Sequence, residues 1–331
     1  MSGALVYLVS KGAQDVYIND KFNTDKKNIT KYSKFKSFAE FPEQVVFNNT
    51  VNNKSTTTIT INRSGDLISH IWLEGTDLID NLSGATFRLL IGGQQIDLQT
   101  FDYMADIWQI YMAETPSKST IIPLVALQYY PLEIHIDWGS SIENVPDLKM
   151  FANYILLGQE ERTYLAKNKL DFLITQVQRL PYTNEAKLNL RSLNHPVKAI
   201  FFGFESSSPV AADDTWTFDS AALSLNESYV FEQMKPSFFH TVQAYYNTTN
   251  AVIAFNTTLN TPFYTRYYMY SFGNKVDTYS TSGTCNFSRI TSSFLYLTNT
   301  VNRPSKNIKV YAVNYNILRI QDGMAGLLFS N

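Results

Sequence analysis

The sequence Tyr311-Ala-Val-Asn-Tyr-Asn-Ile-Leu-Arg-Ile-Gln-Asp-Gly-Met-Ala-Gly-Leu-Leu-Phe-Ser-Asn331 decides the fold that we predict for this chain. Its first part lies within Asn307–Ile320, whose β-branched and aromatic residues favour one long strand. Its last part, Gly323–Asn331, is an apolar tail interrupted by glycines. Each of its three large apolar side chains would cost about 1.5–3 kcal/mol if left in water, so we predict that packing holds the tail. These side chains are Leu327, Leu328 and Phe329.

Short strand-like runs separated by Gly, Pro, Asn and Thr clusters fill the rest of the chain, a pattern typical of β-sandwiches. The first half has predicted strands at Thr56–Ile61, Leu67–Leu73, Phe87–Ile91, Ile96–Leu98 and Leu132–Ile136, with a hairpin at Gly92-Gly93. The second half has them at Phe172–Gln178, Ala186–Leu190, Val197–Phe204, Tyr229–Met234, Phe239–Tyr246, Val252–Phe255, Tyr267–Ser271 and Phe294–Leu297, with a turn at Asn247–Asn250. Two successive sets of about eight strands are what two jelly rolls require.

One helical segment interrupts the strands. Gln159–Asn168 contains good helix formers, with acidic residues early and a lysine late, as the helix dipole favours. A length of 331 residues suits two domains of roughly 150 residues each. We therefore predict an N-terminal arm at 1–24, a first jelly roll at 25–158, a connector helix at 159–169 and a second jelly roll at 170–331.

The composition is poor in charge and rich in aromatic residues. Charged residues make up 17% of the chain, below the usual ~25%, and aromatic residues make up 14%. This bias suits a protein surrounded by copies of itself, although β-rich secreted enzymes share it. The net charge of −2 supplies no long-range positive field, so we expect no direct binding of nucleic acid. The local basic cluster is interpreted as a solvated loop face; it comprises Lys26, Lys27, Lys31, Lys34 and Lys36.

Cysteine content and hydropathy indicate the compartment. Cys285 is the single cysteine, which excludes an internal disulfide framework and is compatible with a reducing compartment. No run of apolar residues reaches the ~18 needed to span a bilayer. Met1–Val9 lacks the basic region of a secretory signal. The sequence therefore predicts a protein made in the cytoplasm.

Six segments, in order along the chain, resemble the double jelly-roll major capsid proteins of large eukaryotic (nucleocytoplasmic) DNA viruses. One resembles the N-terminal arm of that family, one a Pro-Leu-x-Ala-Leu-x-Tyr strand, one the strand that opens the second roll and one its Asn-His-Pro strand entry. The last two resemble the end of the family's sequences. The segments are Gly12–Tyr17, Ile122–Tyr130, Leu173–Gln178, Asn194–Phe204, Ser282-Gly-Thr-Cys-Asn-Phe-Ser-Arg-Ile290 and Tyr311–Asn331.

The resemblance implies an all-β protein that builds a shell and has no catalytic site, cofactor or metal. It implies a homotrimer whose six jelly rolls form a pseudo-hexagonal capsomer of an icosahedral double-stranded DNA virus. The implied partners are neighbouring capsomers, minor capsid proteins and penton proteins, with the N-terminal arm a candidate for contact with an internal membrane. The implied location is the virion, after assembly in the host cytoplasm.

The resemblance also implies structural roles for two short motifs. Asn194, His195 and Pro196 would be turn residues at the start of a strand, where the missing N–H of proline interrupts no ladder. The second motif contains Cys285, Asn286 and Arg289. We interpret Cys285 as a small buried thiol rather than a nucleophile. Arg289 is expected to pair with a carboxylate or with backbone carbonyls.

Other residues admit a chemical and a structural interpretation. His135-Ile-Asp137 is half of a metal site or, as we favour, a polar strand face, and His240 is interpreted as a packed histidine. The acidic pairs Asp213-Asp214 and Glu160-Glu161 are the type of residue that glycosidases use, but solvated charge is the better interpretation. The aromatic run Tyr267–Tyr270 is either core or a subunit contact.

The sequence also leaves open a modification at asparagine sequons and two functions other than building a shell. Asn247 and Asn256 are candidate glycosylation sites through a route that the virus itself would supply. A carbohydrate-binding or host-attachment β-sandwich protein of a virion is the alternative function. A β-sandwich glycoside hydrolase is the weakest hypothesis, because no carboxylate pair falls on predicted strands.

Overall fold

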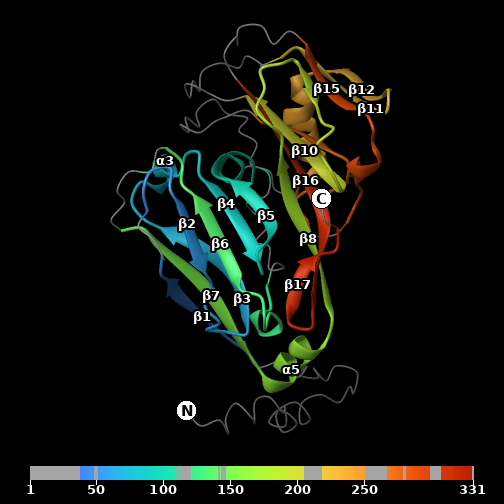
Figure 1. The fold of residues 1–331 in the computed structure, drawn as a ribbon. Helices are drawn as coiled ribbons and strands as arrows, with labels where there is room; N and C mark the ends of the chain where they lie inside the picture. Colours follow the sequence, from blue (N-terminus) through green and yellow to red (C-terminus); the bar gives the residue numbers. More distant parts are fainter. Residues whose placement is uncertain are drawn as a thin grey trace, which may run out of the picture.

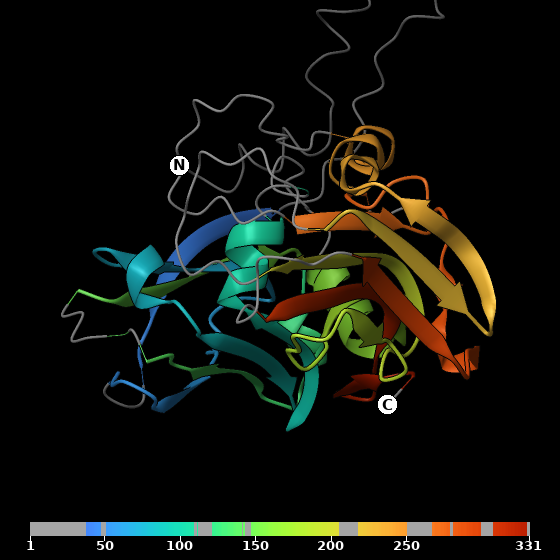
Figure 2. The same cartoon turned by 90° about the horizontal axis from the view of Figure 1, so that it is seen from above.

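The computed structural model describes residues 38–47, 51–108, 111, 121–140, 142, 147–204, 218–249, 267–278, 281–298 and 307–329. Two jelly rolls stand side by side in it (Figures 1 and 2), which confirms the predicted fold class. None of the described helices has the length and apolar character needed to cross a membrane.

Two antiparallel sheets face each other in the first roll. One sheet has the order β1-β7-β3 and is called the β7 sheet below; the other has the order β2-β6-β4-β5. On the other edge of β3, Ile68 forms a single antiparallel β-bridge with Ile122, at the position that a further strand of the sheet would occupy. The strands are β1 (Phe38–Val45), β2 (Thr56–Thr60), β3 (Leu67–Glu74), β4 (Thr86–Ile91), β5 (Gln94–Thr100), β6 (Leu132–Asp137) and β7 (Lys149–Leu157), with a short helix α3 (Leu78–Asn81) after β3.

The second roll repeats this strand order. In the β16 sheet, β16 pairs with β8 and β10, and β10 pairs with β13; the facing sheet has the order β12-β11-β15-β9. Two short strands are added to the β16 sheet, β14 beside β10 and β17 beside β16. The strands are β8 (Leu170–Arg179), β9 (Lys187–Asn189), β10 (Pro196–Phe204), β11 (Ser220–Leu225), β12 (Ser228–Met234), β13 (Tyr267–Ser271), β14 (Cys285–Asn286), β15 (Ser293–Thr298), β16 (Ile308–Gln321) and β17 (Met324–Leu327).

Strands with a clear period of two lie where the sequence predicts them. In β6, Leu132, Ile134 and Ile136 are buried and the residues between them are half-exposed. Gly92 and Gly93 have φ of 57° and 80° and close the hairpin between β4 and β5. The long C-terminal strand is present as β16.

Two predicted strands are wrong. Phe239–Tyr246 is helical, in the π-helical turn η3 (Phe238–Val242) followed by α6 (Gln243–Asn247). In this segment Phe239 and Ala244 are buried while Val242, Tyr245 and Tyr246 are exposed, which is a helical and not an alternating period.

The second error concerns Ile122–Tyr130. Only Ile122 forms a β-bridge, and the chain then turns through the 3₁₀ helix η2 (Leu124–Ala126). Pro123 precedes that turn and has no N–H to extend a ladder. Of the other predictions, strand Val252–Phe255 and the end of the turn at Asn250 lie outside the described residues.

Helix α5 (Gln159–Lys167) joins the two rolls at one end of the molecule (Figure 1). Glu160 and Glu161 occupy its first turn and Lys167 its last, as the helix dipole favours. It has no buried residue, so it connects the rolls without contributing to a core.

The two rolls share apolar cores. Ile174, Leu318 and Ile320 of the second roll belong to the core of the first. A further cluster joins the helical turn η1 (Tyr103–Trp108) of the first roll to the outward face of the β16 sheet. The rolls are therefore packed together as one body.

The C-terminal tail is held mainly through its backbone. Strand β17 pairs with β16, and the Leu328 N–H donates to the carbonyl of Ile317 at 2.9 Å. Leu327 packs against the core of the first roll. Leu328 and Phe329 remain 38% and 52% exposed, so the predicted burial is wrong for these two side chains.

Candidate functional site

The two motifs singled out in the second half of the sequence meet in space. Strand β14 pairs with the start of β10, so that Pro196 lies opposite Asn286 and Val197 opposite Cys285. Pro196 is the first residue of β10, where no N–H is lost from the ladder of the sheet.

His195 makes the turn that brings them together. Its φ is 64°, in the left-handed region, and its side chain is only 8% exposed. Its N–H donates to Ser288 Oγ at 2.8 Å, and its carbonyl accepts from the Phe287 N–H at 3.0 Å. The Asn286 side chain accepts from the Ser288 N–H at 3.1 Å and caps the short helix η4 (Phe287–Arg289). Backbone and side chains of the two motifs thus hold each other in place.

Asn194 links this turn to the strand that opens the second roll. The Gln178 side chain accepts from the Asn194 N–H at 2.9 Å and donates to the Asn194 carbonyl at 2.7 Å. The same Gln178 amide donates to Asn314 Oδ1 at 2.8 Å. Asn194 therefore connects the turn to β8 and β16.

A network of side-chain amides continues from there through the interior. Asn314 and Asn316 are 0% and 2% exposed on β16. The Asn316 amide donates to Gln176 Oε1 and to the Phe329 carbonyl, both at 2.8 Å. Gln176 in turn donates to the carbonyl of Ile96 in the first roll. Because buried polar groups are costly unless paired, this network fixes the strands that it joins.

The motifs in the sequence do not indicate this network. The available signal was the pair of asparagines at alternate positions in an otherwise apolar strand, where asparagine is disfavoured. Their glutamine partners, Gln176 and Gln178, lie more than a hundred residues away along the chain and could not be inferred from spacing.

Cys285 and Arg289 differ in their surroundings. Cys285 is half-buried, and burial raises the pKa of its thiol, which disfavours the reactive thiolate. Arg289 is exposed, and within the described part of the chain no carboxylate pairs with it.

The remaining candidates for chemistry do not converge on a site. His135 lies 3.4 Å from Glu133, and Asp137 pairs with Arg88 at 2.7 Å on the same strand face. No group of metal-binding side chains occurs among the described residues. His240 stacks edge-on near Tyr268. In the aromatic run of β13, Tyr267, Tyr268 and Met269 are buried in core clusters.

Only one of the two acidic pairs lies within the described residues. Glu160 and Glu161 are at the solvent-facing start of α5, and Asp213-Asp214 lies outside the described residues. The lysine cluster and Asn256 also lie outside them. Asn247 ends α6, half-buried, and its amide donates to Gln243 Oε1 at 3.0 Å.

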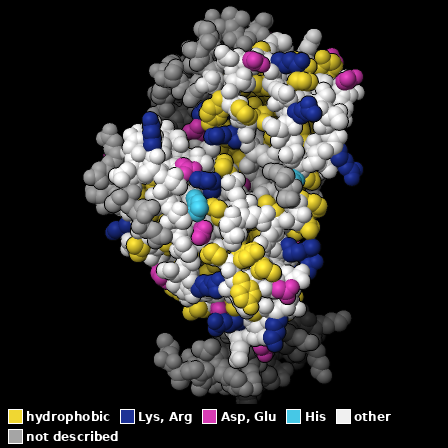
Figure 3. Space-filling view, viewed as in Figure 1, with side chains coloured by type: hydrophobic (Ala, Val, Ile, Leu, Met, Phe, Trp, Pro, Cys, Tyr) yellow, Lys and Arg dark blue, Asp and Glu magenta, His cyan; other side chains and the backbone are white. Residues whose placement is uncertain are grey.

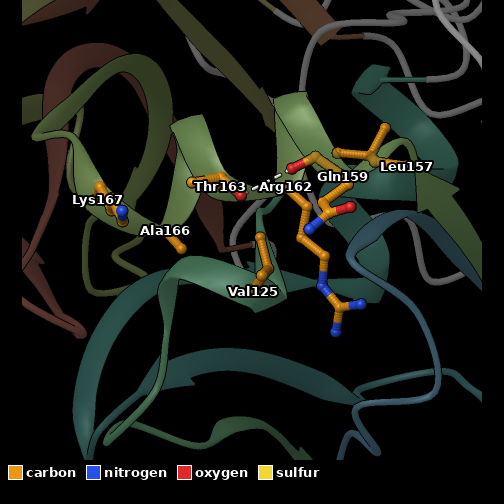
Figure 4. A pocket seen from close by; sticks show the side chains of 7 residues that line it. All are labelled: Val125, Leu157, Gln159, Arg162, Thr163, Ala166 and Lys167. Carbon is orange, nitrogen blue, oxygen red and sulfur yellow. Dashed lines mark hydrogen bonds between the residues drawn. The ribbon is translucent and has the colours of Figure 1, made fainter.

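One shallow hollow of about 570 Å³ lies along α5 (Figure 4). One face of the helix lines it together with Val125 and Leu157. The charged residues of this lining are Arg162 and Lys167, both on the helix. Arg162 is held by Asp66 at 3.0 Å. The seven lining side chains in Figure 4 include these two cations and no carboxylate.

Two jelly rolls packed in one chain define the double jelly-roll fold. The structure matches a quasi-atomic model of the PBCV-1 virus capsid with a TM-score of 0.73 and 22% identity, over 94% of this chain and 100% of that chain. It matches the Faustovirus major capsid protein with a TM-score of 0.60 and 12% identity, over 91% and 94% of the two chains.

The sequence comparisons identify the family. The family model described as "Large eukaryotic DNA virus major capsid protein" matches residues 161–326. The major capsid protein of Pyramimonas orientalis virus is 29% identical and that of Paramecium bursaria Chlorella virus 1 is 27% identical, each over the full length of both chains. This chain belongs to the large eukaryotic DNA virus major capsid protein family. It is a structural protein of the virus capsid and not an enzyme.

Proposed function

We propose that the chain forms a homotrimer, and that the trimer is the pseudo-hexagonal capsomer of an icosahedral double-stranded DNA virus shell. The observation that carries this proposal is the presence of two rolls with the same strand order in one chain. Three such chains around a threefold axis present six similar units, which tile a surface as a hexagon does. The shared cores support it further, because rolls packed as one body keep a fixed angle to each other.

The division of the chain is part of the proposal. An arm at 1–24 precedes a first roll at 25–158, a connector at 159–169 and a second roll at 170–331. The arm is a candidate for contact with minor capsid proteins or an internal membrane. Neighbouring capsomers and penton proteins are the other partners, and assembly takes place in the host cytoplasm.

Asn194, His195 and Pro196, together with Cys285, Asn286 and Arg289, have a structural role in this proposal. The pairing of Pro196 with Asn286 and the bond from the His195 N–H to Ser288 Oγ support it, because they hold the two motifs together. Direct contact with nucleic acid is not part of the function. The face in Figure 3 supports this, because lysine and arginine side chains are interspersed with acidic ones over it.

The test is the mass and shape of the purified full chain. Size-exclusion chromatography with light scattering should give a particle of three chains of 37.7 kDa each, and negative-stain electron microscopy should show a hexagonal outline. A monomer over the whole concentration range, or a dimer, would overturn the proposal. Binding of the monomer to a glycan array would instead favour the carbohydrate-binding alternative.

A further inference from the structure

The same connection in each roll carries a helix. In the first roll the helical turn η1 follows β5, the fifth strand. In the second roll η3 and α6 follow β12, which is also the fifth strand. The two helical segments are thus at equivalent places in two equivalent folds.

The helical segment of the first roll packs against the second roll. Tyr103, Ile107 and Tyr111 are each at most 2% exposed and follow the spacing of one helix face. They pack on the outward face of the β16 sheet. The Tyr111 ring lies 5.3 Å from that of Phe201, and its hydroxyl donates to the Tyr267 carbonyl at 2.7 Å. In Figure 2 this helix lies between the two rolls.

The helical segment of the second roll packs with one side on its own roll, through Phe239 and Ala244, and among the described residues nothing is packed on its other side to the extent seen for η1. Ala244 faces the β16 sheet, but the opposite side of the helix is open. Val242, Tyr245 and Tyr246 are 40%, 73% and 68% exposed and follow the i, i+3, i+4 spacing of one face. Figure 2 shows this helix at the periphery of the molecule, away from the first roll. Two adjacent exposed tyrosines beside a valine are typical of a protein contact.

The first roll has a sheet equivalent to the β16 sheet, against which η1 packs. This is the β7 sheet, and Trp72 and Phe151 lie opposite each other on neighbouring strands of it. Met150, Ala152 and Tyr154 point into the core, so Phe151 points away from it. The rings of Trp72 and Phe151 stack at 5.5 Å between centroids.

The outward face of the β7 sheet is therefore apolar around Trp72 and Phe151, and next to them Asn153 on the same face donates to Ser69 Oγ at 2.8 Å. Phe38, on the edge strand β1, points to the same face and is 64% exposed. Trp72 and Phe151 lie on the third and the last strand of the first roll. The surface on which η1 packs is likewise formed by the third and the last strand of the second roll, through Phe201 and Tyr311.

We propose that the helix face of Val242, Tyr245 and Tyr246 docks on the outward face of the β7 sheet, around Trp72 and Phe151, of a second copy of this chain. The contact between chains then repeats the contact that η1 makes within one chain. This inference rests on the proposed trimer and specifies which surfaces form it. It covers the exposed helix face and the half-buried Trp72 and Phe151 with one interface, and repetition around a threefold axis closes the ring.

Cross-linking between differently tagged chains tests the pairing. Cys285→Ser provides a background without cysteine. One tagged chain carries Tyr246→Cys, the other carries Trp72→Cys, and the two are co-expressed and treated with a short bis-maleimide. We expect a cross-link between the two different tags. The matched control replaces Tyr246→Cys with Tyr164→Cys, a tyrosine on α5 that is 62% exposed, and should give none. A cross-link between two Tyr246→Cys chains would overturn the proposed pairing.

Charge substitution tests the contribution of this surface to assembly. The variant Tyr245→Glu/Tyr246→Glu should raise the concentration at which trimers form by on the order of tenfold or more, with an unchanged melting temperature of the monomer. Tyr164→Glu should leave that concentration unchanged. A trimeric wild-type chain with an unaffected variant and no cross-link would overturn this contact alone. A wild-type chain that stays monomeric would overturn the trimer and the contact together.

Discussion

His195 combines a backbone conformation and a degree of burial that few non-glycine residues share. Its φ of 64° costs roughly 1 kcal/mol for a residue with a Cβ, and less for asparagine, which tolerates the left-handed region. His195→Ala should therefore lower the free energy of unfolding by about 2 kcal/mol, through lost packing and unrelieved strain. His195→Asn should lower it less. Urea denaturation monitored by tryptophan fluorescence measures the free energy of unfolding of both variants. Equal losses in the two variants would show that strain at the left-handed φ does not contribute to the cost of replacing His195.

Lys198 is a buried cation whose charge depends on pH. Its side chain is only 5% exposed, and burial lowers its pKa from 10.5 to about 8, although the nearby Asp277 opposes that shift. Between these two values the unfolded chain binds more protons than the folded chain. Stability linked to Lys198 therefore rises as pH rises from about 8 toward 10.5.

A pH series on a double variant checks this sign. Lys198→Met/Asp277→Asn removes both charges and leaves no unpaired carboxylate. Relative to this variant, the wild-type free energy of unfolding should increase by about 2 kcal/mol between about pH 7.5 and pH 10. Because tyrosines titrate in both proteins, their effect cancels in the difference. A flat difference across that range would contradict the lowered pKa.

At the scale of elements, the hairpin between β16 and β17 depends on its two turn residues. Asp322 and Gly323 have φ of 54° and 79°, the combination that an Asp-Gly hairpin turn uses. A Cβ on Gly323 would lie 2.7 Å from the ring of Tyr129, whose N–H donates to the Gly323 carbonyl at 3.0 Å. The turn that starts β17 is therefore also a contact with the first roll.

Gly93 and Gly323 have nearly the same φ, so alanine at each position distinguishes the cost of backbone strain from the cost of a steric clash. Gly93 has φ of 80° and open space where a Cβ would be. Gly93→Ala should lower stability by about 1 kcal/mol through backbone strain alone, and Gly323→Ala by more. Replacing Tyr129 by alanine should remove the difference between them in thermal melts. If Gly93→Ala were as costly as Gly323→Ala beside an intact Tyr129, crowding at the turn would be excluded.

The elements that sequence predicts best are those with one dominant period. Leu132–Ile136 alternates and forms β6. The aromatic content of Phe239–Tyr246 favours a strand, but the burial of its side chains follows a helix. Strand β7 was missed because Met150–Ile155 alternates poorly: its outward residues, such as Phe151, are also apolar. In the candidate site, the motifs of His195 and Cys285 could be identified, but their partners could not. Those partners come from strands paired across long distances in sequence.

At the scale of the whole molecule, the joint between the rolls contains a buried ion pair. Lys309 Nζ on β16 lies 2.5 Å from Asp102 Oδ2, which follows β5 in the first roll. The two side chains are 9% and 21% exposed, so water screens the pair little. Nearby, Thr100 donates to the Tyr311 hydroxyl at 3.3 Å across the same joint. The angle between the rolls thus depends on polar contacts as well as on the apolar cluster around η1.

Removing one charge of this pair should destabilise the joint more than removing both. Lys309→Met leaves Asp102 buried without its partner and should cost about 3 kcal/mol, whereas Lys309→Met/Asp102→Leu should recover a large part of that loss. Arg319→Met is the matched control, because Arg319 and Asp171 pair at 2.8 Å with side chains 35% and 41% exposed, and should cost at most about 1 kcal/mol. Urea denaturation of wild type, Lys309→Met, Asp102→Leu and the double variant gives the coupling energy. A double variant no more stable than Lys309→Met would contradict the prediction, because it would show that the unpaired Asp102 carries no penalty. In the proposed trimer, six rolls close a ring at one angle between the rolls of each chain. If the pair helps to fix that angle, the double variant should form fewer closed capsomers than wild type at equal protein concentration.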